Sequence, residues 1–242
     1  MGQGAFAFCQ NLKEIKFLGS SPSFGSHCFD GIAAAAYYPG HDPSWTQETM
    51  LNYDGTIGWY GDNPEDEFAS GTLRNNISWS ITGNTLTITG SGYMELSSGA
   101  PWAVYKDLVK AVEISEGILS VGSRAFMNFS QLTKVTLPAG LLYINGSAFY
   151  ECVSLTEINL PSSLERIEAR AFSRCISLES LTLPDSLESV ESYAFQSCSS
   201  LQSINIPRKI REIEQGMFYG CTGLTSITLP ANITYYHQFN SL

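Results

Sequence analysis

A phenylalanine returns in this 242-residue sequence every 23 residues, and four further columns keep the same interval. They are a cysteine, a leucine, a proline and an aliphatic column. The five columns contain Phe126, Phe149, Phe172, Phe195 and Phe218; Cys152, Cys175, Cys198 and Cys221; Leu132, Leu155, Leu178, Leu201 and Leu224; Pro138, Pro161, Pro184, Pro207 and Pro230; and Ile144, Ile167, Val190 and Ile213. Columns that stay in register exclude chance, and a fixed period indicates a solenoid in which each repeat forms one coil.

The layout of one coil can be read from residues 148–172, AFYECVSLTEINLPSSLERIEARAF. In its LTEINLP stretch, the apolar residues Ile158 and Leu160 alternate with Glu157 and Asn159, which is the period of a strand with one buried face. The proline that follows lacks the N–H that would continue a strand ladder, so it ends the strand. A single coil cannot bury this apolar set alone, and stability must come from stacked neighbours.

The period of 23 residues falls in the range of leucine-rich repeats, and LTEINLP reproduces their L-x-x-L-x-L core with isoleucine in the middle place. Leu164 and Ile167 are expected to return the chain to the core on the far wall. We therefore predict an α/β-type, β-rich leucine-rich repeat solenoid, a right-handed superhelix with a β-hairpin cap at its start. Residues 103–230 are expected to contribute five in-register strands to one parallel sheet.

Charged residues make up only 15% of the chain, and 13 basic against 23 acidic residues give a net charge of −10. Such a charge repels phosphate backbones and anionic membranes, so nucleic acid is not an expected partner. No stretch approaches the roughly 20 apolar residues of a membrane span, so no membrane insertion by this segment is expected. The Ser-, Thr- and Asn-rich composition suits an exported protein, and we expect an extracellular or cell-surface location.

Four segments are predicted along the chain. Residues 1–61 read as the end of a preceding repeat array plus an exit cap, and residues 62–71, DNPEDEFASG, read as an acidic linker. Residues 72–108 are expected to form a β-hairpin module, and residues 109–242 the leucine-rich repeat domain.

The first residues already carry the repeat, because Phe29 lies 23 residues after Phe6. The matching positions of this coil are Phe6, Cys9, Leu12, Ile15 and Phe17. The chain thus starts in the middle of a repeat array, and we infer that it is a segment of a longer protein. Trp45, Tyr53 and Trp59 are expected to cover the open end of this array, with a strand at residues 56–60.

The hairpin is predicted from ISWSITGNTLTITGSG, in which apolar and polar residues alternate on both sides of Gly83-Asn84, a two-residue turn signal. In the coil that follows, Ala103 and Lys106 stand in the phenylalanine and cysteine columns. This first coil therefore reads as a cap.

These segments carry a family resemblance. The sequence AFYECVSLTEINLPSSLERIEARAF resembles the BspA-type leucine-rich repeat of bacterial surface proteins, and the likeness covers residues 126–230. The segment ISWSITGNTLTITGSGYMELSSGAPWAVYKDLVKAVEISEGILSVGSRAF resembles the module that often precedes such arrays, and AAAAYYPGHDPSWTQETMLNYDGTIGW resembles their exit module. The resemblance implies a surface or secreted protein, with adhesion and host-protein binding as family functions, and supplies no catalytic residues. Phe129, Met217 and Tyr236 depart from the pattern.

Five of the six cysteines lie on one column, Cys9 included, and Cys28 replaces the alanine of an Ala-Phe pair. A metal site and disulfides are the functional alternatives. The step of 23 residues is unlike the short spacing of zinc ligands. Stacked coils place such cysteines about 5 Å apart, near disulfide range, but with parallel Cβ vectors. We predict reduced, buried thiols at Cys152, Cys175, Cys198 and Cys221.

No motif for catalysis, metal binding or phosphate binding is present, and His27, His41 and His237 stand far from other ligand residues in the sequence. A column of carboxylates could hold calcium or act as an acid/base pair. It consists of Glu168, Glu191 and Glu214, with Glu165 and Glu188 nearby, and its expected neutralising partners are Arg166, Arg170, Arg208 and Arg211. A solvated, partly paired face is the favoured interpretation. We therefore expect no catalytic residue, no metal and no cofactor, and the protein is predicted not to be an enzyme.

The leading hypothesis is a non-enzymatic binding or adhesion module, monomeric, that recognises a host or extracellular protein, or a glycan, through the outward face of its sheet. A passive spacer that displays other domains is the first alternative, and a carboxylate-based, glycan-active enzyme is a remote one. The predicted face consists of Lys134, Thr136, Glu157, Asn159, Ser180, Thr182, Ser203, Asn205, Ser226 and Thr228.

Overall fold

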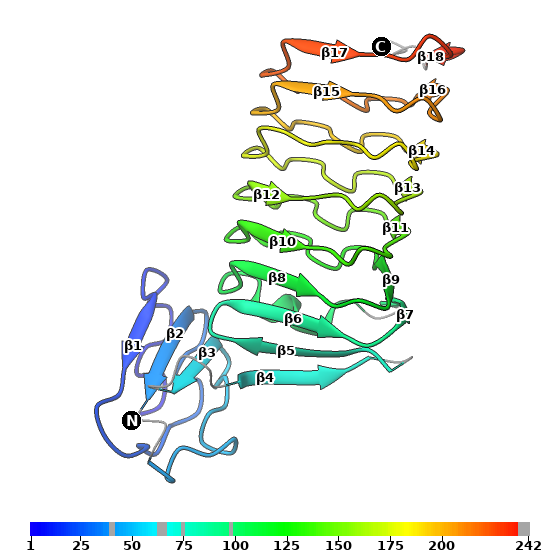
Figure 1. The fold of residues 1–242 in the computed structure, drawn as a ribbon. Coiled ribbons are helices and arrows are strands. Elements are labelled where there is room, and N and C mark those ends of the chain that lie inside the picture. The colour runs from blue at the N-terminus through cyan, green and yellow to red at the C-terminus, as the bar shows by residue number, and fades with distance from the viewer. Residues whose placement is uncertain (39–41, 62–66, 74–75, 97–98, 237–242) are drawn as a thin grey trace. The chain divides into compact units, whose positions relative to one another are not determined.

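A computed structural model describes all residues except 39–41, 62–66, 74–75, 97–98 and 237–242 (Figure 1). The chain divides into two compact units, each considered by itself below. The first contains Met1–Ser70 and Ser80–Leu86, and the second contains Gly71–Trp79 and Thr87–Leu242. The predicted segment boundaries of the chain remain a prediction.

The first unit contains a three-stranded parallel sheet with the order β1-β2-β3. Its strands are β1 (Glu14–Lys16), β2 (Ala33–Tyr38) and β3 (Thr56–Gly61). The predicted strand at residues 56–60 is thus confirmed, with one residue more. Phe6 stacks on Phe29 with 5.9 Å between ring centroids, so the aromatic column of the repeat exists here too. Trp45 and Trp59 are buried in the core of this unit, and Tyr53 packs against it.

Part of the predicted linker is a strand. Residues Glu67–Thr72 form strand β4, which extends one sheet of the structure at its edge. The β-compatible Thr72 stands at the end of this strand, and the acidic composition does not keep the whole segment in a loop. Residues 62–66 of the same segment lie outside the described residues.

The predicted β-hairpin is present. Strands β5 (Ser78–Thr82) and β6 (Thr85–Thr89) flank a two-residue turn in which Gly83 has φ of +57°. Trp79 and Ile81 are buried on the inward face. The short strand β7 (Gly92–Tyr93) and the 3-10 helix η1 (Pro101–Tyr105) lead into the coils.

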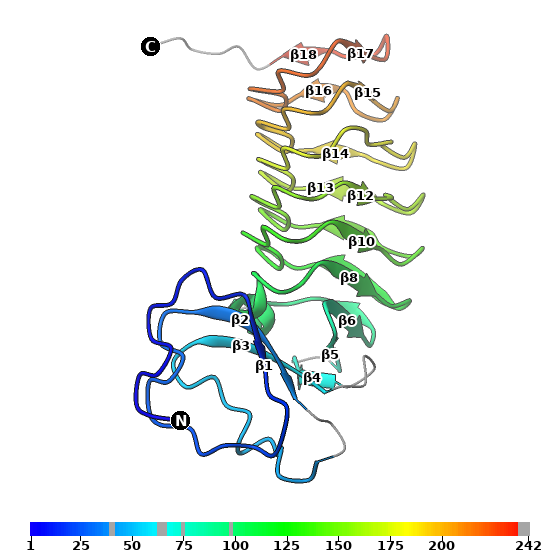
Figure 2. The same cartoon turned by 90° about the vertical axis from the view of Figure 1, so that its left-hand side faces the viewer.

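The stacked coils that follow form parallel strands on two walls (Figures 1 and 2). The first wall has the order β12-β10-β8-β6-β5-β4, continued by the pair β15-β17. Its strands are β8 (Ala111–Ile114), β10 (Lys134–Thr136), β12 (Glu157–Ile158), β15 (Ser203–Asn205) and β17 (Ser226–Thr228). The register joins equivalent residues of successive coils, as between Lys134 and Glu157. The predicted parallel pairing is confirmed, although the coil at Ser180 contributes a single bridge to Ser203 instead of a strand. The right-handedness of the coil remains a prediction.

The second wall was predicted only as a return to the core, without strands. It consists of β9 (Ile118–Val121), β11 (Tyr143–Ile144), β13 (Arg166–Ile167), β14 (Ser189–Val190), β16 (Glu212–Ile213) and β18 (Tyr235–Tyr236). Here the order is β14-β13-β11-β9-β7, with β16-β18 as a separate pair. Most of these strands have two residues, too short for the period-2 signal that identifies a strand in a sequence.

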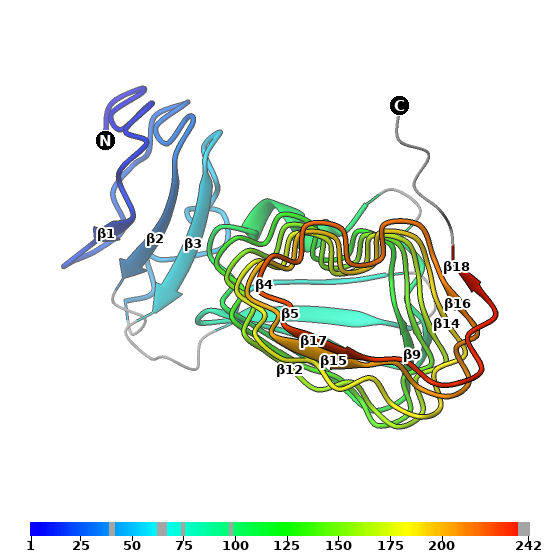
Figure 3. The same ribbon diagram turned by 90° about the horizontal axis from the view of Figure 1, so that it is seen from above.

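A third wall is built from turns, and we call it the turn wall. Its main-chain N–H groups also bond from coil to coil: Phe149 N–H donates to the Ala171 carbonyl at 2.8 Å, and Phe172 N–H to the Ala194 carbonyl at 2.8 Å. In each coil, two residues of this turn, four positions apart in the sequence, adopt left-handed backbone conformations. These positive-φ residues are Arg124, Asn128, Ser147, Glu151, Arg170, Arg174, Tyr193, Ser197, Gly216 and Gly220. All three walls are therefore hydrogen-bonded along the axis, as the end-on view lets the reader follow (Figure 3).

Between the walls, the phenylalanine column forms a continuous stack. Ring centroids of neighbouring members are 5.3 to 5.7 Å apart from Phe126 to Phe218, with interplanar angles of 6° to 17°. Most of these rings are fully buried. The 23-residue period thus appears in the core as a column of stacked rings.

The cysteine column lies beside the phenylalanine stack, and all its thiols are free. Cys175 Sγ–H donates to the Phe149 carbonyl at 3.2 Å, and Cys152, Cys198 and Cys221 repeat this bond in the preceding coil and in the two following coils. The prediction of reduced, buried thiols is confirmed for Cys152, Cys175 and Cys198. For Cys221 the free thiol is as predicted but full burial is wrong, because this residue is only half-buried. Cys9 is exposed and Cys28 is buried.

Candidate functional site

The ten residues of the predicted sheet face are all exposed. They alternate with buried apolar residues of the same segments, namely Val135, Ile158, Leu181 and Ile204, which are at most 7% exposed. In the last coil the equivalent Ile227 is 40% exposed. The outward direction predicted from the alternation is thus present in the structure, while a binding role for these residues remains a prediction.

The charge of this face is concentrated in one pair. Lys134 Nζ lies 3.2 Å from Glu157 Oε2 on the neighbouring strand. In the later coils Ser203 stands opposite Ser226, and Asn205 opposite Thr228. Away from the Lys134–Glu157 pair, the face offers short hydroxyl and amide groups in register.

The glutamate column is tied to the main chain of the preceding coils. Glu168 Oε2 accepts the Gly146 N–H at 2.8 Å, and Glu191 Oε2 accepts the Ala169 N–H at 3.1 Å. Glu214 Oε2 accepts the Ser192 hydroxyl at 3.5 Å, at the limit of a hydrogen bond. The column was predicted to be neutralised by nearby arginines, but main-chain and hydroxyl donors are the partners seen here. Such carboxylates brace successive coils.

The two nearby glutamates are paired differently. Lys209 Nζ lies 2.9 Å from Glu188 Oε1, and this hydrogen bond and the lysine charge lower the pKa of the Glu188 carboxyl. On the second wall, the Tyr143 hydroxyl donates to Glu165 Oε2 at 3.2 Å. The charge of that carboxylate, together with the hydrogen bond, raises the pKa of Tyr143. Neither glutamate is left without a partner.

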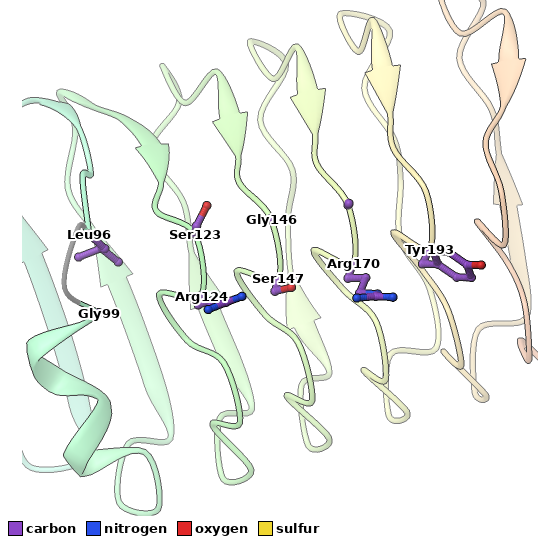
Figure 4. A pocket seen from close by; sticks show the side chains of 9 residues that line it. Leu96, Gly99, Ser123, Arg124, Gly146, Ser147, Arg170 and Tyr193 are labelled. Carbon is purple, nitrogen blue, oxygen red and sulfur yellow. The ribbon is translucent and has the colours of Figure 1, made fainter.

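A groove runs across the turn wall over four successive coils. It is open to solvent, has a volume of about 810 Å³, and we call it the turn-wall groove (Figure 4). Its lining consists of Leu96, Gly99, Ser123, Arg124, Gly146, Ser147, Ala169, Arg170 and Tyr193. Arg124, Ser147, Arg170 and Tyr193 are equivalent left-handed residues of successive coils, while Ser123, Gly146 and Ala169 precede them in the sequence. The groove exists because these preceding residues are small.

The left-handed residues of this wall pack on one another along the axis. The Arg170 guanidinium carbon lies 5.4 Å from the centroid of the Tyr193 ring, within the distance of a cation–π interaction. The Tyr193 ring in turn covers Gly216 so closely that a Cβ atom there would overlap it. The sequence contains no direct signal for this groove, because arginine, serine and tyrosine are unusual residues for a positive φ.

Metal and acid/base chemistry receive no support from the described residues. Among them, no group of three or more His, Cys, Asp or Glu side chains is placed to hold a metal ion. His27 Nδ1 lies 2.7 Å from Asp54 Oδ2 on the surface. The other two histidines, His41 and His237, lie outside the described residues. Within the same described ranges, no helix has the length and apolarity needed to cross a bilayer.

Comparisons with known proteins agree with this architecture. A family model described as "BspA type Leucine rich repeat region" matches in six copies, over residues 1–37, 103–168 and 143–240. No curated protein matches the chain.

Two solved structures illustrate the likeness. The pneumococcal vaccine antigen PcpA is 21% identical with a TM-score of 0.50, over 96% of this chain and 55% of that one. A leucine-rich repeat protein from Bacteroides ovatus is 23% identical with a TM-score of 0.54, over 68% of this chain and 49% of that one. The chain therefore spans about half the length of these two structures, and at this identity the likeness concerns the fold.

Proposed function

Because the chain belongs to the BspA-type leucine-rich repeat family, we propose that it is a non-enzymatic binding module of a bacterial cell-surface or secreted protein. Membership in this family supports a repeat module with a binding or structural role. The proposal adds that the module binds, and that its ligand is a host or extracellular protein. A glycan is the second class of ligand that the same surface could accept.

The observation that carries the proposal is the exposed sheet face. Five coils present outward side chains in register, which are short and uncharged away from the Lys134–Glu157 pair. Strands about 4.8 Å apart give a face roughly 20–25 Å wide, enough for part of a protein interface. Short side chains lose little rotamer entropy when a partner docks. Ser180, Ser203 and Ser226 form an uncharged stripe in which hydroxyl groups can donate and accept hydrogen bonds.

Three observations support a location outside the cell. The family resemblance is to bacterial surface proteins, one structural neighbour is described as a vaccine antigen, and the surface is rich in serine, threonine and asparagine. An extracellular module meets proteins and glycans as its potential partners. This location is part of the proposal.

The alternative of a passive spacer is favoured by one feature, the hydrogen bonding of all three walls along the axis. A solenoid whose coils are all hydrogen-bonded to one another is stiff along its axis, so it can hold another domain at a fixed distance. The remote alternative of an enzyme is weakened, because Glu168 and Glu191 already accept main-chain N–H groups. Glycan cleavage that disappears in a Glu191→Gln variant would restore it.

The test is a capture experiment with the isolated chain, immobilised and exposed first to extracellular host proteins and then to glycans. Any ligand is titrated against a Ser180→Arg, Ser203→Arg double variant whose circular dichroism matches the wild type. The matched control carries arginines at Ser162 and Thr222, which are exposed in turns outside the strands.

We expect the sheet-face variant to lose at least about tenfold in affinity, because each arginine displaces a partner from a packed face. The turn control should bind like the wild type. Equal affinity of both variants would remove the sheet face as the binding surface. Failure of the folded chain to capture any ligand would favour the spacer.

A further inference from the structure

The turn-wall groove lies on a different wall from the sheet face and has its own chemistry. We propose that it binds an acidic linear oligosaccharide, with sugar carboxylates on Arg124 and Arg170 and sugar hydroxyls on the glutamate carboxylates beside its floor. This site is independent of the proposed sheet-face function. The inference rests on the shape of the groove, on its two guanidinium groups and on the acceptors beneath them.

The shape follows from the left-handed residues. Arg124, Ser147, Arg170 and Tyr193 have φ between +56° and +61°. Because the groove crosses four stacked coils, an extended ligand fits it along the axis. A second hollow of about 450 Å³ lies against the same Arg124, Ser147 and Arg170, which therefore form a ridge between two depressions.

The two arginines supply the positive charge. Among the ion pairs that the described residues form, the basic partners are Lys16, His27, Lys106, Lys134, Arg174 and Lys209, and neither groove arginine is included. Arg124 and Arg170 are exposed. Figure 4 shows Arg124 extending toward Ser147 and Arg170 toward Tyr193, so both guanidinium groups lie along the groove. A planar guanidinium can bind a carboxylate through two parallel hydrogen bonds.

The separation of the arginines favours an extended ligand. Arg124 and Arg170 are two coils apart, which corresponds to about 10 Å along the axis. A single carboxylate cannot pair with both groups over that distance. A linear polymer with an acidic group on its repeating unit can place one carboxylate on each arginine.

The floor distinguishes a sugar from an acidic peptide. Glu168 Oε2 lies 3.7 Å from where a Cβ atom of Gly146 would stand, so this carboxylate lies directly beside the floor residue Gly146. Glu191 bonds the floor residue Ala169 in the same way as Glu168 bonds Gly146. These two acids oppose a purely anionic ligand, yet the carboxylate oxygens have further lone pairs that can accept hydrogen bonds from sugar hydroxyl groups. A uronic acid carries a carboxylate for the arginines and several hydroxyl donors for the glutamates on the same ring, whereas an acidic side chain carries only the carboxylate and leaves the main-chain N–H as the donor of a peptide.

The experiment titrates the whole chain with an oligogalacturonate by isothermal calorimetry. Two further probes are its carboxyl-reduced neutral form and a poly-glutamate of similar charge. The test variant is Arg124→Gln, Arg170→Gln, and the matched control is Arg208→Gln, Arg211→Gln, which removes the same charge from other exposed positions. Circular dichroism and the thermal midpoint show whether each variant is folded.

We expect the oligogalacturonate to bind, the groove variant to lose at least about tenfold in affinity, and the control variant to stay within about twofold. Binding should weaken as salt rises, because exposed charges are screened. An absence of binding, an equal loss in the control variant, or equal binding of the neutral sugar would overturn the proposal. Poly-glutamate bound as tightly, with the same arginine dependence, would replace the sugar by an acidic peptide and so overturn it as well.

Discussion

The indole ring of Trp102 stacks on the phenyl ring of Phe126, with 6.1 Å between their centroids and an interplanar angle of 24°. The indole Nε1–H donates to the Ala125 carbonyl at 2.8 Å, and Trp102 is fully buried. The aromatic column therefore begins at Trp102, one residue before the alanine that stands in the phenylalanine column of the sequence. The first coil is closed by a ring that the repeat pattern alone does not place.

The first prediction concerns this cap. Replacing Trp102 by alanine should lower the free energy of unfolding by about 3–5 kcal/mol, because a large buried ring is removed and Phe126 loses its neighbour. Trp102→Phe should cost less, since a ring remains while the Ala125 carbonyl loses its donor. Urea denaturation followed by far-UV circular dichroism measures both. Equal costs for the two variants would show that stacking contributes nothing.

The second prediction concerns thiol exposure. Native protein treated with iodoacetamide should react first at Cys9, which is exposed, and then at Cys221, which is half-buried. The buried Cys152, Cys175 and Cys198 should react at least about a hundredfold more slowly, at a rate set by transient opening of the coils. Peptide mass spectrometry of timed samples gives the five rates. Fast modification of Cys175 in folded protein would contradict the packing.

The third prediction follows from the same thiols in alkaline solution. Burial raises the pKa of Cys175 far above its ordinary value of 9.0. In alkaline solution Cys175 therefore keeps its thiol proton in the folded state and loses it in the unfolded chain. The free energy of unfolding that the neutral thiol contributes is complete below pH 9.0 and declines as the pH rises above that value. The decline is at most about 1.4 kcal/mol for each pH unit.

A Cys175→Ala variant isolates this effect. Its free energy of unfolding should fall less steeply between pH 8 and pH 10 than that of the wild type, by roughly 1 kcal/mol over the interval. Urea titrations under reducing conditions measure both slopes. Parallel curves would mean that the thiol of Cys175 titrates alike in both states.

The hydrogen bond to the Phe149 carbonyl also makes the Cys175→Ser substitution less destabilising than burial of an unpartnered hydroxyl would be, at about 1 kcal/mol of unfolding free energy.

The fourth prediction concerns Gly216, which has φ of +60° and lies under the Tyr193 ring. Gly216→Ala should destabilise the protein by about 1–2 kcal/mol or more, because an L-residue is strained at this φ and the added methyl group overlaps the ring. In a Tyr193→Ala background the overlap disappears and only the backbone strain remains. A double-mutant cycle by thermal or urea denaturation should therefore show a coupling above about 0.5 kcal/mol. Simple additivity would contradict the contact.

Much of the fold could be predicted because the period of the sequence is also the period of the structure. The alternation around Ile158 places one face of the sheet, and Gly83-Asn84 places the hairpin. The second wall was missed because two-residue strands such as Tyr143–Ile144 carry no alternation. The first coil was predicted to be a cap, but its closing ring was not identified, because Trp102 stands one position before the phenylalanine column.

The turn-wall groove was beyond sequence reasoning for a different reason. Gly216 and Gly220 hint at left-handed positions in the last coil, but equivalent positions hold Arg170 and Tyr193 in earlier coils. The stacked coils, and not a local propensity, impose this conformation. Which side chains of neighbouring coils come into contact then depends on how the coils stack along the axis, which the sequence does not give. The sheet face was foreseeable by contrast, because strand alternation alone determines which side chains point outward.

The stacked phenylalanine column has an evolutionary consequence. Each interior ring, such as Phe172, stacks on its equivalents 23 residues away, Phe149 and Phe195. Duplication or deletion of one whole coil would leave every remaining ring with a neighbour at the same spacing. A gene of this kind can therefore change the length of its product by recombination between coils, and the binding surfaces grow or shrink without a new core having to evolve.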